Sequence, residues 1–126
     1  MEIVKKRILI VEDDPDILEV LNLSFIDEGY DVVLSKLAIG TAWVEGIHPD
    51  LLLMDIRLEG SVLNGNELCA LLKSNALIKG LPVILISAEI NIQQLCKECA
   101  ADAYIKKPFD LDHLFSTVKA LISKRV

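Results

Sequence analysis

Three short apolar runs recur along the chain, ILIV at 8–11, LLLM at 51–54 and VILI at 83–86. Polar residues or turn formers bound each run, which is typical of strands buried on both faces of a parallel sheet. Two weaker stretches, at 32–34 and 103–105, complete a set of five predicted strands.

Helical patterns follow these strands. Asp14 and Pro15 offer an N-cap followed by proline in the first turn, and the pattern stops before Gly29. The last helix begins at Asp110 and carries an unbroken apolar stripe to the end of the chain. Intermediate helices are predicted at about 38–47, 64–76 and 90–100.

Strand and helix alternate five times, which predicts an α/β fold with right-handed crossovers. We expect a doubly wound, five-stranded parallel sheet with helices on both faces. A length of 126 residues suits one domain, and no linker or repeat interrupts it. The whole chain, residues 1–126, is therefore expected to be a single domain with no output domain.

Composition narrows the possible partners. The net charge is −6 and the cationic residues form only small groups, so we expect no nucleic-acid surface. The apolar run at 8–11 is too short for a signal-peptide core, and no stretch is long enough to cross a bilayer. These features predict a cytoplasmic protein that does not enter a membrane.

The chain contains three cysteines, Cys69, Cys96 and Cys99, an odd number that argues against a disulfide framework. Ile92, Leu95, Cys96 and Cys99 share one helical stripe, so both thiols of this C-x-x-C pair are interpreted as core residues. Redox or zinc chemistry is the alternative for this pair.

Polar residues collect where the predicted strands end. The carboxyl ends of parallel strands form the ligand-binding edge of an open α/β sheet, so these side chains should converge. The first strand leads to Glu12, Asp13 and Asp14, the third to Asp55, the fourth to Ser87 and Ala88, and the fifth to Lys106, Lys107 and Pro108.

Clustered carboxylates raise one another's proton affinity unless a cation neutralises them. Mg²⁺ prefers oxygen ligands and is commonly held by one or two carboxylates together with a phosphate. Asp55 could then act as a nucleophile toward phosphorus, with a lysine and a serine hydroxyl offsetting charge on the phosphoryl oxygens. Each residue alone could instead be an ordinary strand end or solvated turn, and residues 12–14 a simple helix cap.

The motifs ILIVEDD, LLLMDI, LISA and YIKKPF resemble the receiver domain of two-component response regulators over essentially the whole chain. The resemblance implies a flavodoxin-like sheet of strand order 2-1-3-4-5. It also implies a role for each matching residue: Asp55 as phosphoacceptor; Asp13, Asp14, Asp55 and the main-chain carbonyl of Arg57 as metal ligands; Ser87 and Lys107 as phosphoryl-stabilising groups; Tyr104 as an aromatic switch; and Glu12, Ala88 and Pro108, the last after a cis peptide, as supporting residues.

The implied function is phosphorelay signal transduction with Mg²⁺ as cofactor. A sensor histidine kinase or phosphotransfer protein would phosphorylate Asp55. The domain would not be a dedicated enzyme, because it would catalyse only its own phosphorylation and slow dephosphorylation. A face made by the fourth helix, fifth strand and fifth helix would bind a downstream target protein. The alternative is a receiver-like interaction module that is never phosphorylated.

Two loops depart from the family pattern. Gly65 lies ten residues after Asp55 rather than the usual eight, and the loop before it contains no proline. Ser87 and Lys107 are 20 positions apart, about two fewer than in the family, which predicts a clipped loop before the fourth helix. Arg57 and Glu89, each two residues after a site residue, are expected to form an ion pair over the phosphoryl group.

Two other kinds of site are disfavoured by the residues at key positions. Phosphatases with an aspartyl nucleophile typically carry an acid two residues later, where this chain has Arg57. A flavodoxin-like flavin binder cradles phosphate in its first loop, where Glu12 to Asp14 would repel an anion. His48 and His113 are interpreted as surface residues.

Overall fold

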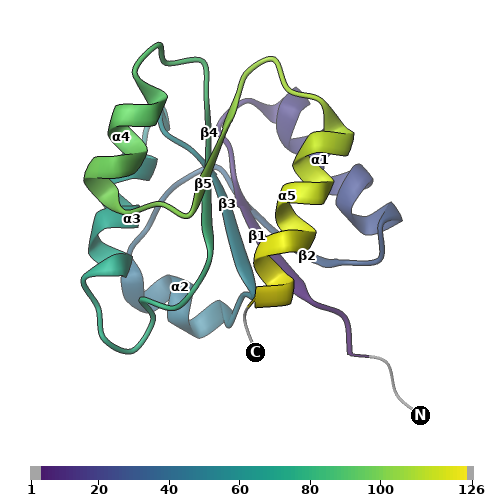
Figure 1. Cartoon of the computed structure of the whole chain (residues 1–126), viewed down its shortest axis with the longest axis horizontal. Helices are drawn as coiled ribbons and strands as arrows, with labels where there is room; N and C mark the ends of the chain where they lie inside the picture. The colour runs from purple at the N-terminus through teal and green to yellow at the C-terminus, as the bar shows by residue number, and fades with distance from the viewer. Residues whose placement is uncertain (1–3, 125–126) are drawn as a thin grey trace.

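The computed structural model describes residues 4–124 and contains one five-stranded sheet (Figure 1). All neighbouring strands pair in parallel, in the order β2-β1-β3-β4-β5. The strands are β1 (Arg7–Val11), β2 (Asp31–Ser35), β3 (Leu51–Asp55), β4 (Val83–Ser87) and β5 (Ala103–Lys106). The predicted fold class and strand order are confirmed.

Helices cover both faces of the sheet, and Figure 1 shows α3 and α4 to the left of the strands and α1 and α5 to the right. Residues of α2, α3 and α4 share one buried cluster, and residues of α1 and α5 share the other. The helices are α1 (Pro15–Asp27), α2 (Thr41–Ile47), α3 (Gly65–Lys73), α4 (Ile92–Cys99) and α5 (Leu111–Lys124).

Alternation within the apolar runs explains this double-sided core. Leu9 and Val11 of β1 enter the cluster under α2, α3 and α4, whereas Ile8 and Ile10 enter the cluster under α1 and α5. Successive side chains of a strand point to opposite faces, so a strand buried on both sides must be apolar at every position. β3 and β4 are buried at all of their positions for the same reason.

One helix begins later than its pattern predicts. The helix expected from residue 38 begins at Thr41, because Ala38 forms an isolated antiparallel bridge with Leu63. The predicted helix at 64–76 ends at Lys73, and the other helices agree with their predictions to within two residues. The loop between β3 and α3 therefore contacts the loop between β2 and α2, which the local sequence does not indicate.

The cysteines and histidines lie where the sequence places them. Cys69, Cys96 and Cys99 are buried and free, and burial raises the pKa of the Cys96 thiol to about 11, so the core interpretation is confirmed. His48 and His113 are exposed. None of the described helices has the length and apolar character needed to cross a membrane.

Candidate functional site

Three carboxylates meet at the carboxyl edge of the sheet. β1 and β3 are neighbours, and Val11 is opposite Met54, so the residues that follow, Glu12 and Asp55, also lie side by side. Oxygen atoms of Glu12, Asp13 and Asp55 lie within 4.8 Å of one another. Glu12 and Asp55 are buried, and Asp13 is partly exposed. The predicted convergence of acids from separate strands is therefore present.

Lys107 reaches these carboxylates from the end of β5. Its Nζ donates a hydrogen bond to Asp55 Oδ2 at 2.8 Å and one to Glu12 Oε1 at 3.2 Å. Its backbone N–H donates to the Ser87 carbonyl at 3.0 Å, and the peptide bond to Pro108 is cis, as expected. Burial alone would lower the pKa of Lys107, but the hydrogen bonds and charges of Asp55 and Glu12 outweigh it and raise the pKa.

Glu12 lies deepest in the site, with its side chain 1% exposed. Burial, followed by the charge of Asp55, raises its pKa to about 7, although Lys107 and the Asp14 amide act in the opposite direction. Its Oε2 is 3.0 Å from Lys107 Nζ but is buried without a hydrogen-bond partner. Three carboxylates face one lysine, and one buried carboxylate oxygen has no hydrogen-bond donor, so the donor set fits a hard divalent cation such as Mg²⁺.

Asp13 and Asp14 occupy different environments despite being adjacent. Asp13 Oδ2 accepts a hydrogen bond from the Glu59 amide at 3.0 Å and lies in the carboxylate group. Asp14 is exposed and caps α1, with Oδ1 accepting from the amides of Asp16 at 2.9 Å and Ile17 at 3.3 Å. The metal role predicted for Asp14 stays a prediction. Glu12, expected only to support the acid pair, takes the place beside Asp13 in the cluster.

Ser87 ends β4 and is buried, and its Oγ accepts a hydrogen bond from the Glu89 amide at 3.0 Å. Ala88 follows as an exposed residue of the rim. The predicted ion pair is present, because Arg57 Nε lies 2.6 Å from Glu89 Oε1. The pairing of Asp55 with Ile86 places the segments after β3 and β4 side by side, which brings these two charges together.

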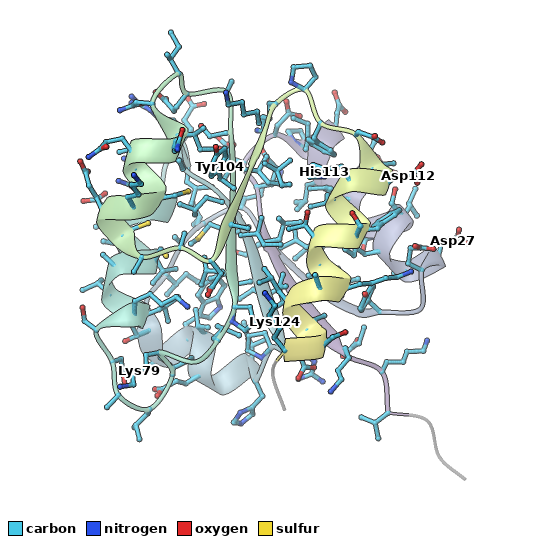
Figure 2. All side chains as sticks on the ribbon, viewed as in Figure 1. Asp27, Lys79, Tyr104, Asp112, His113 and Lys124 are labelled. Atoms are coloured by element: carbon cyan, nitrogen blue, oxygen red, sulfur yellow. The ribbon has the colours of Figure 1, made fainter. Side chains whose placement is uncertain are left out.

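Tyr104 lies on β5 and is partly buried against the core cluster of α2, α3 and α4. It borders a hollow of about 480 Å³ between α4, β5 and α5 that Cys96, Ala100 and His113 also line. Figure 2 shows Tyr104 and His113 in the upper half of the view, on β5 and near the start of α5. The predicted switch residue therefore faces the surface that sequence reasoning assigned to a partner.

Gly65, noted in the sequence only for its unusual spacing, packs directly on the site. Its amide donates to the Ile56 carbonyl at 2.8 Å, and a Cβ atom at this position would overlap the carbonyl oxygen of Asp55. Glycine is thus required for contact with Asp55, not for a special backbone angle. The spacing of this glycine from an acid at a strand end is a signal that could have indicated the contact.

Comparison with known families matches the model of the response regulator receiver domain to residues 8–119. The chain is 32% identical to the DNA-binding response regulator MtrA of Mycolicibacterium smegmatis over 127 aligned positions, covering 98% of this chain and 54% of that protein. The chain thus spans about half the length of this curated relative.

Solved structures give the same likeness. A response regulator receiver domain protein (CheY-like) from Methanospirillum hungatei has a TM-score of 0.84 and 31% identity, with 97% of each chain covered. The receiver domain of a signal transduction histidine kinase from Syntrophus aciditrophicus has a TM-score of 0.81 and 31% identity, covering 94% of this chain and 91% of that one. Domains similar to this chain therefore occur both in a DNA-binding response regulator and in a histidine kinase.

Proposed function

The chain belongs to the response regulator receiver domain family, a family of signalling domains, and on that premise we propose that Asp55 is its phosphoacceptor. The observation that carries the proposal is the position of Asp55, which is buried at the end of β3, hydrogen-bonded to Lys107, and close to the carboxylates of Glu12 and Asp13. This arrangement places a nucleophilic oxygen of Asp55 beside the Lys107 ammonium and beside carboxylate oxygens that could bind a metal cation.

We propose Asp13, Asp55 and the carbonyl of Arg57 as ligands of Mg²⁺, with Glu12 rather than Asp14 as the nearby second acid. The place of Glu12 in the group of close carboxylates and the capping role of Asp14 support this choice. A bound Mg²⁺ would supply positive charge for the phosphoryl oxygens and for the crowded carboxylates. Asp14, which the sequence predicts as a metal ligand, is the alternative to Glu12.

The chemistry is a transfer of one phosphoryl group to a carboxylate. An oxygen of Asp55 forms a bond to phosphorus while the bond from phosphorus to the donor breaks, a P–N bond for a phosphohistidine or a P–O bond for acetyl phosphate. The Lys107 ammonium and the Ser87 hydroxyl offset charge on the phosphoryl oxygens. Arg57 and Glu89 lie across the rim and would hinder water that attacks the acyl phosphate.

Switching would start at Ser87 and end at Tyr104. Ser87 Oγ accepts a hydrogen bond from the Glu89 amide at 3.0 Å, so its own O–H group is available to donate to a phosphoryl oxygen, and a shift of Ser87 toward that oxygen would draw the Glu89 amide with it. The hollow beside Tyr104 offers space for the ring to move, and such movement would remodel the face of α4, β5 and α5. We propose that a downstream target protein binds there and that a sensor histidine kinase or phosphotransfer protein donates the phosphoryl group.

Three wider expectations stay proposals. Residues 1–126 as a single receiver domain, and a cytoplasmic location, are predictions from sequence. The domain is also proposed to catalyse its own phosphorylation on Asp55 and the slow hydrolysis of the resulting acyl phosphate. A receiver-like module that never accepts phosphate is the competing function, and the presence of Asp55, Lys107 and the acidic group in contact argues against it.

Intact-mass analysis after treatment with acetyl phosphate tests the proposal. The wild type should gain one phosphoryl group when Mg²⁺ is present and little when it is removed by a chelator. Asp55→Asn should not be labelled in either condition. Labelling that persists in Asp55→Asn would contradict Asp55 as the phosphoacceptor, and labelling that is independent of Mg²⁺ would contradict the proposed metal site. A wild type that is not labelled in either condition would favour the competing function.

A further inference from the structure

The loop between β3 and α3 is fastened to the loop between β2 and α2 by one serine. The Ser61 hydroxyl accepts a hydrogen bond from the Ala38 amide at 3.0 Å and donates one to the Ala38 carbonyl at 3.1 Å. Ala38 also forms an antiparallel bridge with Leu63 and is 3% exposed. A single side chain thus satisfies both backbone groups of a buried residue in another loop.

Ser61 also closes a tight turn that carries a contact to the site. Its amide donates to the Leu58 carbonyl at 3.1 Å, and Gly60 adopts a positive φ of 81°, as the third residue of a type II turn requires. The second residue of the turn is Glu59, whose amide donates to Asp13 Oδ2 at 3.0 Å. Fixing Ser61 therefore fixes the amide that orients Asp13.

The loop between β2 and α2 is also linked to Glu12, the neighbour of Asp13. Ser35 Oγ accepts from the Leu37 amide at 3.1 Å and donates to the Leu37 carbonyl at 2.7 Å. The Ser35 carbonyl accepts from the Glu12 amide at 3.0 Å. These hydrogen bonds, joined by short stretches of backbone, therefore form a closed ring from the backbone of Glu12 through Ser35 and Ser61 to the carboxylate of Asp13.

We propose that Ser61 is a positioning residue for the metal site, acting through the Glu59 amide on Asp13 and through the loop backbone on Arg57. The inference rests on the proposed function, because it concerns affinity for Mg²⁺. Ordering a free loop costs conformational entropy at every residue that becomes fixed. Because the ring orders the loop when the protein folds, Asp13 and the Arg57 carbonyl are already in place before Mg²⁺ binds.

Ser61→Ala removes both hydrogen bonds to Ala38 and little volume. We expect its affinity for Mg²⁺ to fall about tenfold, the size typical for loss of a group that orients a ligand. Ser61→Thr keeps a hydroxyl and should restore most of the affinity. Ser74→Ala is the matched control, because Ser74 Oγ also hydrogen-bonds a backbone carbonyl, that of Ala70 at 2.9 Å, but lies at the end of α3 away from the acids.

The experiment titrates each ¹⁵N-labelled protein with MgCl₂ and follows the backbone amide of Glu59. Hydrogen exchange at that amide without metal, and urea unfolding, are measured on the same samples. In Ser61→Ala we expect faster exchange at Glu59 and weaker Mg²⁺ binding, with Ser74→Ala like the wild type. Ser35→Ala breaks the ring at its other serine and should act in the same direction, which provides a second variant if Ser61→Ala folds poorly.

Two results would overturn the inference alone: unchanged or tighter Mg²⁺ binding by Ser61→Ala, or equal losses in Ser61→Ala and Ser74→Ala. A wild type that binds no Mg²⁺ would overturn the proposed metal site and this inference with it. Weak Mg²⁺ binding in Ser61→Ala with slow exchange at Glu59 would also contradict the proposed route through that amide.

Discussion

Lys107 Nζ lies 2.8 Å from Asp55 Oδ2, an ion pair between the last strand of the sheet and its middle strand. Both side chains are largely buried, 17% and 8% exposed. A buried charge that loses its partner is strongly unfavourable, so this contact links the chemistry of the site to the stability of the fold.

Lys107→Met should therefore slow phosphorylation of Asp55 by about a hundredfold, the size expected when one donor to the developing charge is lost. Without the lysine, Glu12 and Asp55 repel each other, so the variant should gain more stability from added Mg²⁺ than the wild type does. Lys106→Met, an exposed neighbour, is the control. Equal labelling rates in Lys107→Met and wild type, measured by intact mass over time, would contradict this role.

Stability should fall as pH rises through neutrality when no metal is bound. Glu12 has its pKa raised from 4.5 to about 7 in the folded protein, chiefly by burial. Between these values the folded state holds a proton that the unfolded state has released, so raising the pH favours unfolding. The loss between pH 5 and pH 8 should be at most about 3 kcal/mol.

Urea unfolding with a chelator present, compared between the wild type and Glu12→Gln, isolates this effect. The variant cannot ionise at this position and should show a flatter profile over the same pH range. Saturating Mg²⁺ should flatten the wild-type profile as well, since a cation favours the ionised carboxylates. Parallel profiles for the two proteins would rule out Glu12 as the cause.

Gly65→Ala should destabilise the fold and damage the site together. The added methyl group would overlap the Asp55 carbonyl oxygen, so the end of β3 or the start of α3 must shift. Overpacking of this kind costs about 1 to 3 kcal/mol. Gly46→Ala is the matched control, since its Cβ position in α2 is open and the change should stabilise the helix by about 0.5 to 1 kcal/mol.

Both variants can be compared by urea unfolding and by the rate of labelling with acetyl phosphate. Only Gly65→Ala should lose phosphorylation under conditions where it remains folded. A Gly65→Ala protein with wild-type stability would show that α3 can move away from Asp55 at no cost.

Glu89→Ala should shorten the lifetime of the acyl phosphate. The ion pair with Arg57 measures 2.6 Å, but the arginine side chain is 74% exposed, so solvent weakens the pair. Exposed pairs contribute up to about 1 kcal/mol, which corresponds to at most about a fivefold faster decay. Arg57→Ala should have a similar effect, and the double variant should decay no faster than either single one.

The decay rate is measured from loss of the phosphorylated mass after the donor is removed. Glu19→Ala, which removes a negative charge from the exposed surface of α1, should leave it unchanged. The same decay rate in Glu89→Ala and wild type would mean that the pair does not shield the phosphoryl group.

Local patterns in the sequence were sufficient for most of the fold. Apolar runs such as 51–54 and 83–86 identified the doubly buried strands, and the Asp14–Pro15 pair identified the start of α1. The ion pair of Arg57 and Glu89 was also predictable, because equal offsets from neighbouring parallel strands bring residues side by side. Each of these features depends on spacing along the chain.

Features that depend on contacts between distant loops were not predictable. Ser61 and Ala38 are 23 residues apart, and neither belongs to a recognisable motif. The roles of the individual acids were only partly predictable: Asp14 caps α1 through two amides and lies outside the group that Glu12, Asp13 and Asp55 form. The sequence pattern indicated both roles for Asp14, and only the geometry separates it from Glu12.

A crystal structure grown with Mg²⁺ and beryllium fluoride, a mimic of the phosphoryl group, would test the central claim most directly. We expect the mimic on Asp55, in contact with Lys107 and Ser87, and Mg²⁺ about 2.0 to 2.1 Å from oxygens of Asp13, Asp55 and the Arg57 carbonyl. A mimic on another residue, or Mg²⁺ bound away from the acids at the ends of β1 and β3, would contradict the account.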